Sequence, residues 1–200
     1  MDKKEYSASA VKVSFWFQEF RKVIQLLANG NSLDEIKAMN LNENIFSAVT
    51  PQRAKQIFNV VAGRMATLPS DIYNIFLTSD LATQKLIALI AAMAYDELFF
   101  EFVYEVVREK MFMGNDELTD SDFRVFFKGK QEQDAKVAGW TDATFERLKR
   151  CYKKMLYEAG IINKDVGIRK IIPPIVDPVL QAWAESHKMS RYIKAFSGEK

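Results

Sequence analysis

The feature that most constrains this fold is a long apolar segment that carries acids in its second half. Residues 86–107 read LIALIAAMAYDELFFEFVYEVV, with an aspartate at position 96 and three glutamates after it. A helix that spans a bilayer needs about 20 mostly apolar residues, and each acid near its centre costs about 2.5–3.5 kcal/mol. We therefore expect no membrane span. Because apolar side chains cover more than half of the helix circumference, we predict one long buried helix over about residues 81–112.

Residues 1–68 predict a helix-turn-helix-like helical subdomain. Apolar side chains recur every three or four residues over about residues 14–28, as in a half-buried helix. Ser32 and Glu35 have the spacing of a capping box, which starts a short second helix. Thr50 followed by Pro51 starts a longer third helix, because proline suits the first helical turn.

Residues 119–200 predict a second subdomain with the element order of a winged helix. Thr119 or Ser121 caps its first helix, and a basic helix follows between Thr141 and Gly160. β-branched runs then flank the turn-like sequence NKDVG, which predicts a short β-hairpin, and a last helix covers about residues 178–187. Residues 69–118 connect the two subdomains. The predicted fold is thus mainly α, with two small helix-turn-helix-like subdomains joined by a long central helix.

Charge is segregated along the chain although the net charge is only +2. Residues 119–200 hold sixteen bases and eleven acids, and residues 147–154 hold five bases and no acid. On a helical wheel these five bases cover about 200–360°, whereas the apolar residues cover about 40–180°. Like charges three or four residues apart destabilise a helix, and phosphates would neutralise them with release of counterions. We therefore predict that this face binds nucleic acid.

The predicted function is that of a DNA-binding protein without catalytic activity, which contacts duplex phosphates through the basic helix and the wing. The outward face of the third helix adds side chains that suit base edges or phosphates, although an ordinary polar surface is the simpler interpretation there. The candidate DNA-binding residues are Arg147, Lys149, Arg150, Lys153, Lys154, Arg169, Lys170, Gln52, Arg53 and Lys55.

Other interpretations of the basic face stay open. The stripe could dock an acidic surface of a partner protein, which would make the chain a scaffold or adaptor. It could also bind RNA, as helical antitermination factors do, although no aromatic RNA-recognition signature is present. An ordinary solvated helix face would need no partner.

The sequence shows no catalytic, metal-binding or nucleotide-binding signature. Its single histidine, His187, is distant from its single cysteine, Cys151, which lies on the apolar side of its helix and reads as a structural thiol. No Cys/His spacing fits a metal site, and neither glycine-rich phosphate-binding motif is present. Glu97, Glu101 and Glu105 share one helix face, which we interpret as a polar or interface-facing edge. We predict no enzyme activity, cofactor or small-molecule substrate.

The expected location is the cytoplasm. A single cysteine excludes an intramolecular disulfide and fits a reducing compartment. The N-terminal sequence MDKKEYSASAVKVSFWF has neither a continuous apolar stretch nor a cleavage signature, so we do not expect secretion.

Four ordered blocks of the sequence carry a family resemblance. They are FWFQEFRKVIQLLANGNSLDEIKAMNLNENIF, RAKQIF, QKLIALIAAMAYDELFFEFVYEVVREK and the spaced pattern LTDSDFRVFF…W…T…RLKR…LYEAGII. Over about residues 6–175 the chain resembles the BrxA family, small helical proteins of bacteriophage-exclusion (BREX) defence systems. The resemblance implies a cytosolic DNA-binding component without enzymatic activity. It would act beside methyltransferase, ATPase and phosphatase-like partners, and the family supplies no catalytic residues.

Overall fold

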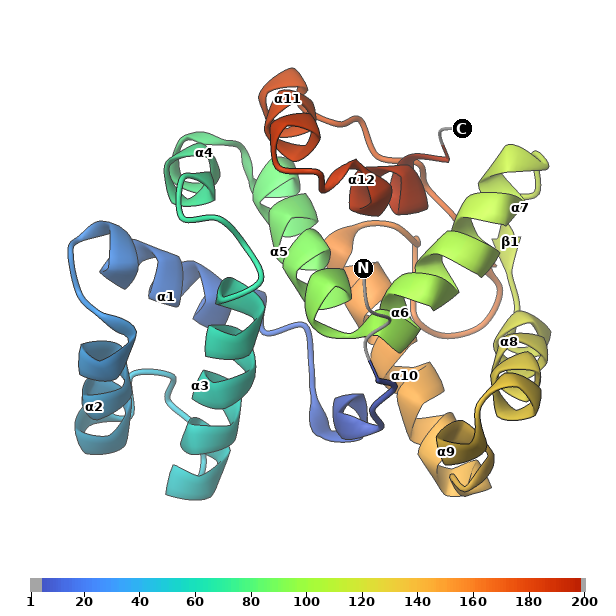
Figure 1. The fold of residues 1–200 in the computed structure, drawn as a ribbon, viewed down its shortest axis with the longest axis horizontal. Helices are drawn as coiled ribbons and strands as arrows, with labels where there is room; N and C mark the ends of the chain where they lie inside the picture. The colour runs from blue at the N-terminus through green and yellow to red at the C-terminus, as the bar shows by residue number, and fades with distance from the viewer. Residues whose placement is uncertain (1–4, 199–200) are drawn as a thin grey trace.

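The computed structural model describes residues 5–198 and is mostly helical, with one small antiparallel strand pair (Figure 1). The first half contains η1 (Ser9–Lys12), α1 (Phe17–Ala28), α2 (Leu33–Glu43), α3 (Pro51–Met65), α4 (Ile72–Thr78), α5 (Leu81–Tyr95) and α6 (Glu97–Phe102). The second half contains η2 (Val103–Arg108), α7 (Glu109–Phe112), β1 (Glu117–Leu118), α8 (Asp120–Gln133), α9 (Ala135–Ala138), α10 (Asp142–Ala159), β2 (Arg169–Lys170), α11 (Pro178–Ser186) and α12 (Ser190–Ser197). This mainly α architecture confirms the predicted fold class.

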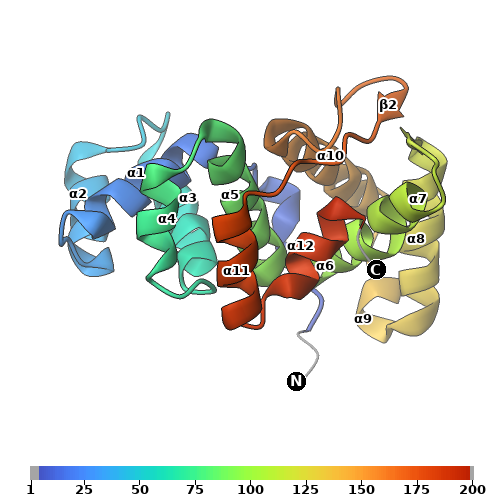
Figure 2. The ribbon, with the colours of Figure 1, turned by 90° about the horizontal axis from the view of Figure 1, so that it is seen from above.

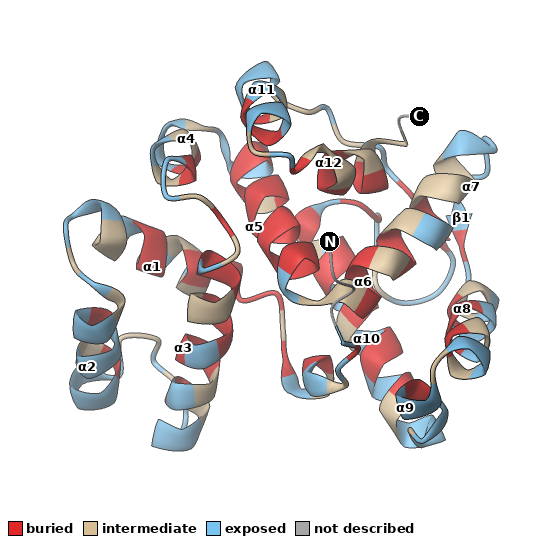
Figure 3. Ribbon diagram, viewed as in Figure 1, coloured by how far each residue is buried: buried red, intermediate tan, exposed pale blue. Residues whose placement is uncertain are grey.

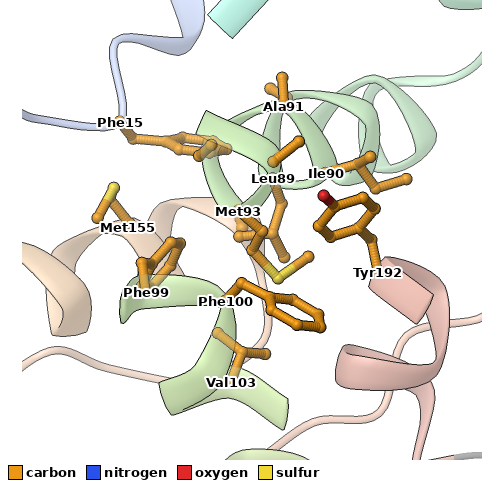
Figure 4. Close-up of a cluster of buried hydrophobic side chains, with 14 of the residues drawn as sticks. Phe15, Leu89, Ile90, Ala91, Met93, Phe99, Phe100, Val103, Met155 and Tyr192 are labelled. Atoms are coloured by element: carbon orange, nitrogen blue, oxygen red, sulfur yellow. The ribbon is translucent and has the colours of Figure 1, made fainter. Parts of the chain in front are cut away.

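Helix α5 lies at the centre of the molecule, with α1–α3 on one side and α8–α10 on the other (Figure 1). Helices α11 and α12 cover a further side, as the view from above also shows (Figure 2). Burial is concentrated along α5 and on the inner side of α10, whereas α2 and α9 are largely exposed (Figure 3). Phe15, Phe99 and Met155 come from three distant segments and meet beside α5 in the core (Figure 4).

The apolar segment is a core helix, as predicted. All residues of α5 from Leu86 to Ala94 are buried. Over the described residues 5–198, no helix combines the length and the apolar character that a bilayer span requires. The boundaries predicted at residues 68 and 118 stay predictions.

The expectation of one continuous helix over residues 81–112 is wrong, because the chain turns at Asp96. Asp96 has an extended backbone (φ −120°, ψ 101°), which ends α5. Its Oδ1 accepts a hydrogen bond from the N–H of Phe99 at 3.2 Å and thereby caps α6. Aspartate favours this position because its carboxylate satisfies an N–H that has no partner inside the helix. Farther along, residues 103–108 form the π-helical turn η2.

The predicted helix starts in the N-terminal subdomain are confirmed, with one shift. Ser32 and Glu35 form the capping box of α2, and Thr50 caps α3 ahead of Pro51. Helix α1 begins at residue 17, whereas the periodicity started at about residue 14. Trp16 has a left-handed backbone (φ 51°), which a helix cannot continue through.

The predicted hairpin pairs with a third segment. An antiparallel bridge joins Ile162 to Ile171, across the NKDVG turn, as expected. Strand β2 also pairs with β1, in the register Glu117 to Lys170 and Leu118 to Arg169. The two-residue strand β1 was not predicted, because it is too short for any alternation to appear.

Helix α12, which follows α11 after a short turn, was also not predicted. Its Tyr192 packs edge-on against Phe100, with ring centroids 5.1 Å apart, and Arg191 lies 4.8 Å from the same ring. Helix α12 also contacts η2 and α5. The sequence predicted a last helix that ends at about residue 187, so this cover over the core was not expected.

Arg64 is a buried cation in the N-terminal half. It lies on α3 and is only 3 % exposed. Its Nη1 donates to the carbonyl of Phe15 at 2.5 Å and its Nη2 to the carbonyl of Ser14 at 3.1 Å, while Nη2 also lies 3.6 Å from Sδ of Met155. Burial lowers the pKa of Arg64 to about 10, partly offset by the charge of Asp96. The guanidinium therefore remains charged at neutral pH.

Asp96 makes the stability of the fold depend on pH. Burial raises the pKa of Asp96 to about 6, although the backbone hydrogen bond from Phe99 and the charge of Arg64 act in the opposite direction. An aspartate in an unfolded chain has a pKa of about 3.9. Between about pH 4 and pH 6 the folded chain therefore binds more protons than the unfolded chain, and this contribution to the free energy of unfolding falls as pH rises.

We predict that Asp96→Asn removes this contribution. Asparagine still caps α6 and has no proton to release. Urea denaturation measures the free energy of unfolding of both proteins. The wild-type value minus the variant value should be largest at about pH 4 and should fall as the pH rises to about 7. A difference in unfolding free energy that stays constant over this range would contradict the prediction.

Candidate nucleic-acid interface

Helix α10 carries the five cations of the predicted basic face. Thr141 caps its start by accepting a hydrogen bond from the N–H of Thr144 at 3.3 Å, and Gly160 ends it in a left-handed conformation (φ 85°). Both ends agree with the sequence prediction. Leu148 and Tyr152 are fully buried on the opposite side, so the core holds α10 in one orientation.

Three of the predicted cations form an ion-pair cluster around Asp120, which we call the Asp120 cluster. Nη2 of Arg169 lies 2.5 Å from Oδ1 of Asp120. Nζ of Lys149 and Nζ of Lys153 lie 3.4 and 3.5 Å from the same carboxylate. The helical wheel placed both lysines on an open stripe, but their side chains are only 11 % and 12 % exposed.

The three cations of the Asp120 cluster stabilise the charge of the one carboxylate between them. Burial raises the pKa of Asp120, but the hydrogen bond from Arg169 and the charges of Lys153 and Lys149 outweigh it, so the pKa lies below its usual range. Lys149 also pairs with Glu146 at 2.7 Å. Arg169 donates to the carbonyl of residue 118 at 3.0 Å. These cations therefore connect α10, β2 and the start of α8.

The remaining cations of α10 point away from this cluster and converge with a residue from the N-terminal segment. Lys12, Arg147, Arg150 and Lys154 are exposed and line a shallow pocket of about 410 Å³, which we call the basic cleft. The other lining residues are Val11, Val13, Ser14 and Cys151. In the part of the chain that the structure describes, no carboxylate lines this cleft.

The contacts that the described residues make with Arg150 and Lys154 in the basic cleft are weak. Nε of Arg150 donates to the carbonyl of Glu146 at a long 3.4 Å. Nζ of Lys154 lies 3.8 Å from the carboxylate of Glu158. Lys12 was missed by the sequence analysis, because a single lysine in an irregular segment gives no pattern. Only the fold brings it beside α10.

Arg53 links the N-terminal subdomain to the basic cleft. Its Nη1 donates to the carbonyl of Lys12 at 3.1 Å, and its guanidinium lies 4.9 Å from the ring centroid of Trp16. Arg53 therefore holds the backbone that carries Lys12. Gln52 and Lys55, on the same helix, are exposed.

The other predicted positions lie outside the basic cleft. Lys170 on β2 is exposed and pairs with Asp116 at 3.1 Å. Glu101 and Glu105 face α8 and contact Lys130 at 2.6 and 2.7 Å, as expected of a polar edge.

The structure places Cys151 at the margin of the basic cleft. Burial raises the pKa of its thiol above the usual range, although the charges of Arg150 and Lys154 act in the opposite direction. The thiol is therefore protonated at neutral pH and a poor nucleophile. Over residues 5–198, no three His, Cys, Asp or Glu side chains are grouped so as to hold a metal.

Fold and surface together define a class: a small, mainly helical protein in which the N-terminal segment and helix α10 contribute cations to one cleft. A sequence model of the BrxA family matches residues 4–188. The curated BREX protein BrxA of Bacillus cereus (strain H3081.97) is 40 % identical over 161 residues, which cover 80 % of each chain. The chain therefore belongs to the BrxA family of BREX proteins, in agreement with the sequence blocks.

Two further similarities extend this comparison. The BREX protein BrxA of Paramagnetospirillum magneticum (strain ATCC 700264 / AMB-1) is 24 % identical over 165 residues, or 82 % of each chain. The crystal structure of an uncharacterized protein from Magnetospirillum magneticum has a TM-score of 0.80 at 17 % identity, and the match covers 98 % of this chain and 100 % of that one. The structural match supports the fold alone.

We predict that Arg169 stabilises the fold more than Lys170 does. Arg169→Ala removes a buried guanidinium that pairs with the partly exposed Asp120 and donates to the carbonyl of residue 118, so we expect it to lower the free energy of unfolding by about 2 kcal/mol. Lys170→Ala removes an exposed pair and should cost less than about 1 kcal/mol. Chemical denaturation measures both. Equal stability of the two variants would contradict a structural role for the Asp120 cluster.

Proposed function

We propose that this BrxA-family chain is a nucleic-acid-binding component of a BREX phage-defence system and contacts duplex DNA phosphates through the basic cleft. It would act without chemistry of its own and without a cofactor. The other components of such a system would be its protein partners, including the methyltransferase, ATPase and phosphatase-like proteins implied by the family resemblance. The cytoplasm is the proposed location.

One observation carries the proposal: four exposed cations from two distant segments line one pocket, and none of the carboxylates of residues 5–198 lines it with them. Such cations repel one another, and the fold gains nothing from bringing them together. The Asp120 cluster shows the alternative, because there each cation lies beside an acid. A polyanion such as a nucleic-acid backbone supplies the missing negative charge and releases its counterions on binding.

The arrangement of the C-terminal elements supports the proposal. Strand β1, helices α8 and α10, and the bridged segments at residues 162 and 171 follow the order of a winged helix. Helix α10 would then hold the place of the recognition helix, and residues 166–168 that of the wing. Val166 and Ile168 are exposed at this turn, where apolar side chains can reach a minor groove.

The proposed function keeps every DNA-binding residue that the sequence predicted, adds one, and divides them into direct contacts and supporting residues. Arg147, Arg150 and Lys154 are the principal phosphate contacts, together with the newly found Lys12. Gln52, Lys55 and Lys170 would extend the surface. Lys149, Lys153, Arg169 and Arg53 would hold these contacts in place.

We predict that removing the cleft cations reduces the salt dependence of binding. In fluorescence anisotropy with a labelled random-sequence duplex, the combined variant Arg147→Ala, Arg150→Ala and Lys154→Ala should bind more weakly than the wild type. The slope of log affinity against log salt should become shallower by about 2–3, because each phosphate contact contributes about 0.9. The three side chains are exposed, so stability should change little.

A matched variant controls for net charge. Lys37, Arg124 and Lys128 are exposed on α2 and α8, outside the basic cleft, and replacing all three by alanine removes the same charge. This control should keep most of the affinity and the slope. Equal losses in both variants would show that total charge, and not the cleft, governs binding. Competition between matched RNA and DNA duplexes tests the RNA alternative.

A second candidate function is that of an adaptor protein, and an apolar groove favours it. The groove, about 850 Å³, lies between the start of α5 and residues 172–178. Leu81, Ile172 and Ile175 line it and are 54 %, 47 % and 95 % exposed. We predict that Ile175→Asp weakens retention of other BREX components in nuclease-treated pull-downs and leaves duplex affinity unchanged. If nuclease treatment alone removes these components from the wild-type pull-down, nucleic acid and not the groove connects them to this chain.

A further inference from the structure

A second pocket adjoins the basic cleft along α10. It measures about 780 Å³ and shares Ser14 and Lys154 with the cleft, so the two pockets lie side by side. Its walls come from the start of α1, the last turn of α10 and residues 160–163. A pocket of this size has the volume of typical small-ligand sites.

The chemistry of this pocket differs from that of the basic cleft. Besides Lys85 and Lys154, it is lined by the carboxylates of Glu19 and Glu158. Burial raises the pKa of Glu158, although the charge of Lys154 opposes this. Two carboxylates beside two lysines disfavour a second phosphate. Carboxylate oxygens suit instead the amino groups on the edges of nucleobases.

Neutral groups that recognise bases complete the walls. Tyr157 is 46 % exposed and offers a ring on which a base can stack. Gln18 is exposed and adds an amide that can both donate and accept. Asn163 accepts the N–H of Lys170 through Oδ1 at 2.9 Å, which fixes this amide at the pocket wall. The pocket thus combines one aromatic ring with side chains that donate hydrogen bonds and side chains that accept them.

Backbone strain lies at the edge of the same pocket. Trp16 lines it and adopts a left-handed backbone (φ 51°), which is unfavourable for a bulky residue. The Arg53 guanidinium lies 4.9 Å from the centroid of the Trp16 ring and stabilises this side chain. Strained residues of this kind concentrate at ligand sites.

We propose that this pocket receives an unpaired base of a nucleic acid whose phosphates lie in the basic cleft. The inference depends on the proposed function, because Lys154 must hold the neighbouring phosphate. The preferred ligand would be a duplex with an unpaired nucleotide or a single-strand junction. Tyr157 stacks on the base, and Gln18 and Glu158 contact its edge.

The test compares two labelled duplexes of equal length, one fully paired and one with a single unpaired 2-aminopurine. Anisotropy should show the wild type binding the unpaired probe at least about fivefold more tightly, as expected for one stacked base. Stacking should also quench the 2-aminopurine emission. Tyr157→Ala should abolish both the preference and the quenching, whereas Tyr157→Phe, which keeps the ring, should retain both.

Affinity for the fully paired duplex separates this inference from the proposed function. Tyr157→Ala should bind the paired duplex as tightly as the wild type, because the basic cleft is intact. If the wild type binds both probes equally without quenching, the base pocket is disproved while phosphate binding stands. If the wild type binds neither probe, the proposed function and this inference both fail.

Discussion

The rest of the architecture depends on the hydrogen bonds that the buried guanidinium of Arg64 donates to the segment before α1. The guanidinium satisfies the carbonyl groups of residues 14 and 15, where the chain lies outside any helix, and it contacts Met155 of α10. A buried cation is costly unless acceptors meet its donors, and Nη1 and Nη2 donate to these carbonyls, so the bonds fix the path between η1 and α1. That path lies between α3 and α10 and carries Lys12 to the basic cleft (Figure 1).

Acidic residues then decide which cations remain available at the surface. Asp120 lies beside one edge of α10 and draws Lys149 and Lys153 into a structural cluster with Arg169. The other edge faces the N-terminal segment, where no acid of the described chain lines the cleft. A single basic stripe in the sequence is thus divided into a supporting half and an accessible half.

The sequence predicted best those features that depend on residues close together along the chain. The caps at Ser32, Thr50 and Thr141 and the end at Gly160 were predictable, because each depends on residues within one turn. The break at Asp96 was missed because hydrophobic periodicity continues on both sides of it. Strand β1 and helix α12 are short elements that tertiary contacts stabilise, so propensity alone gave no strong signal.

The sequence by itself determined the mainly α fold, the buried central segment and the position of the basic helix, because periodicity, capping residues and local charge act over a few residues along the chain. It also carried the resemblance to the BrxA family, through four ordered blocks. Only the tertiary structure decided which cations are accessible. Ion pairing depends on distance in space, and Asp120, like Lys12, is far from α10 in sequence but beside it in the fold.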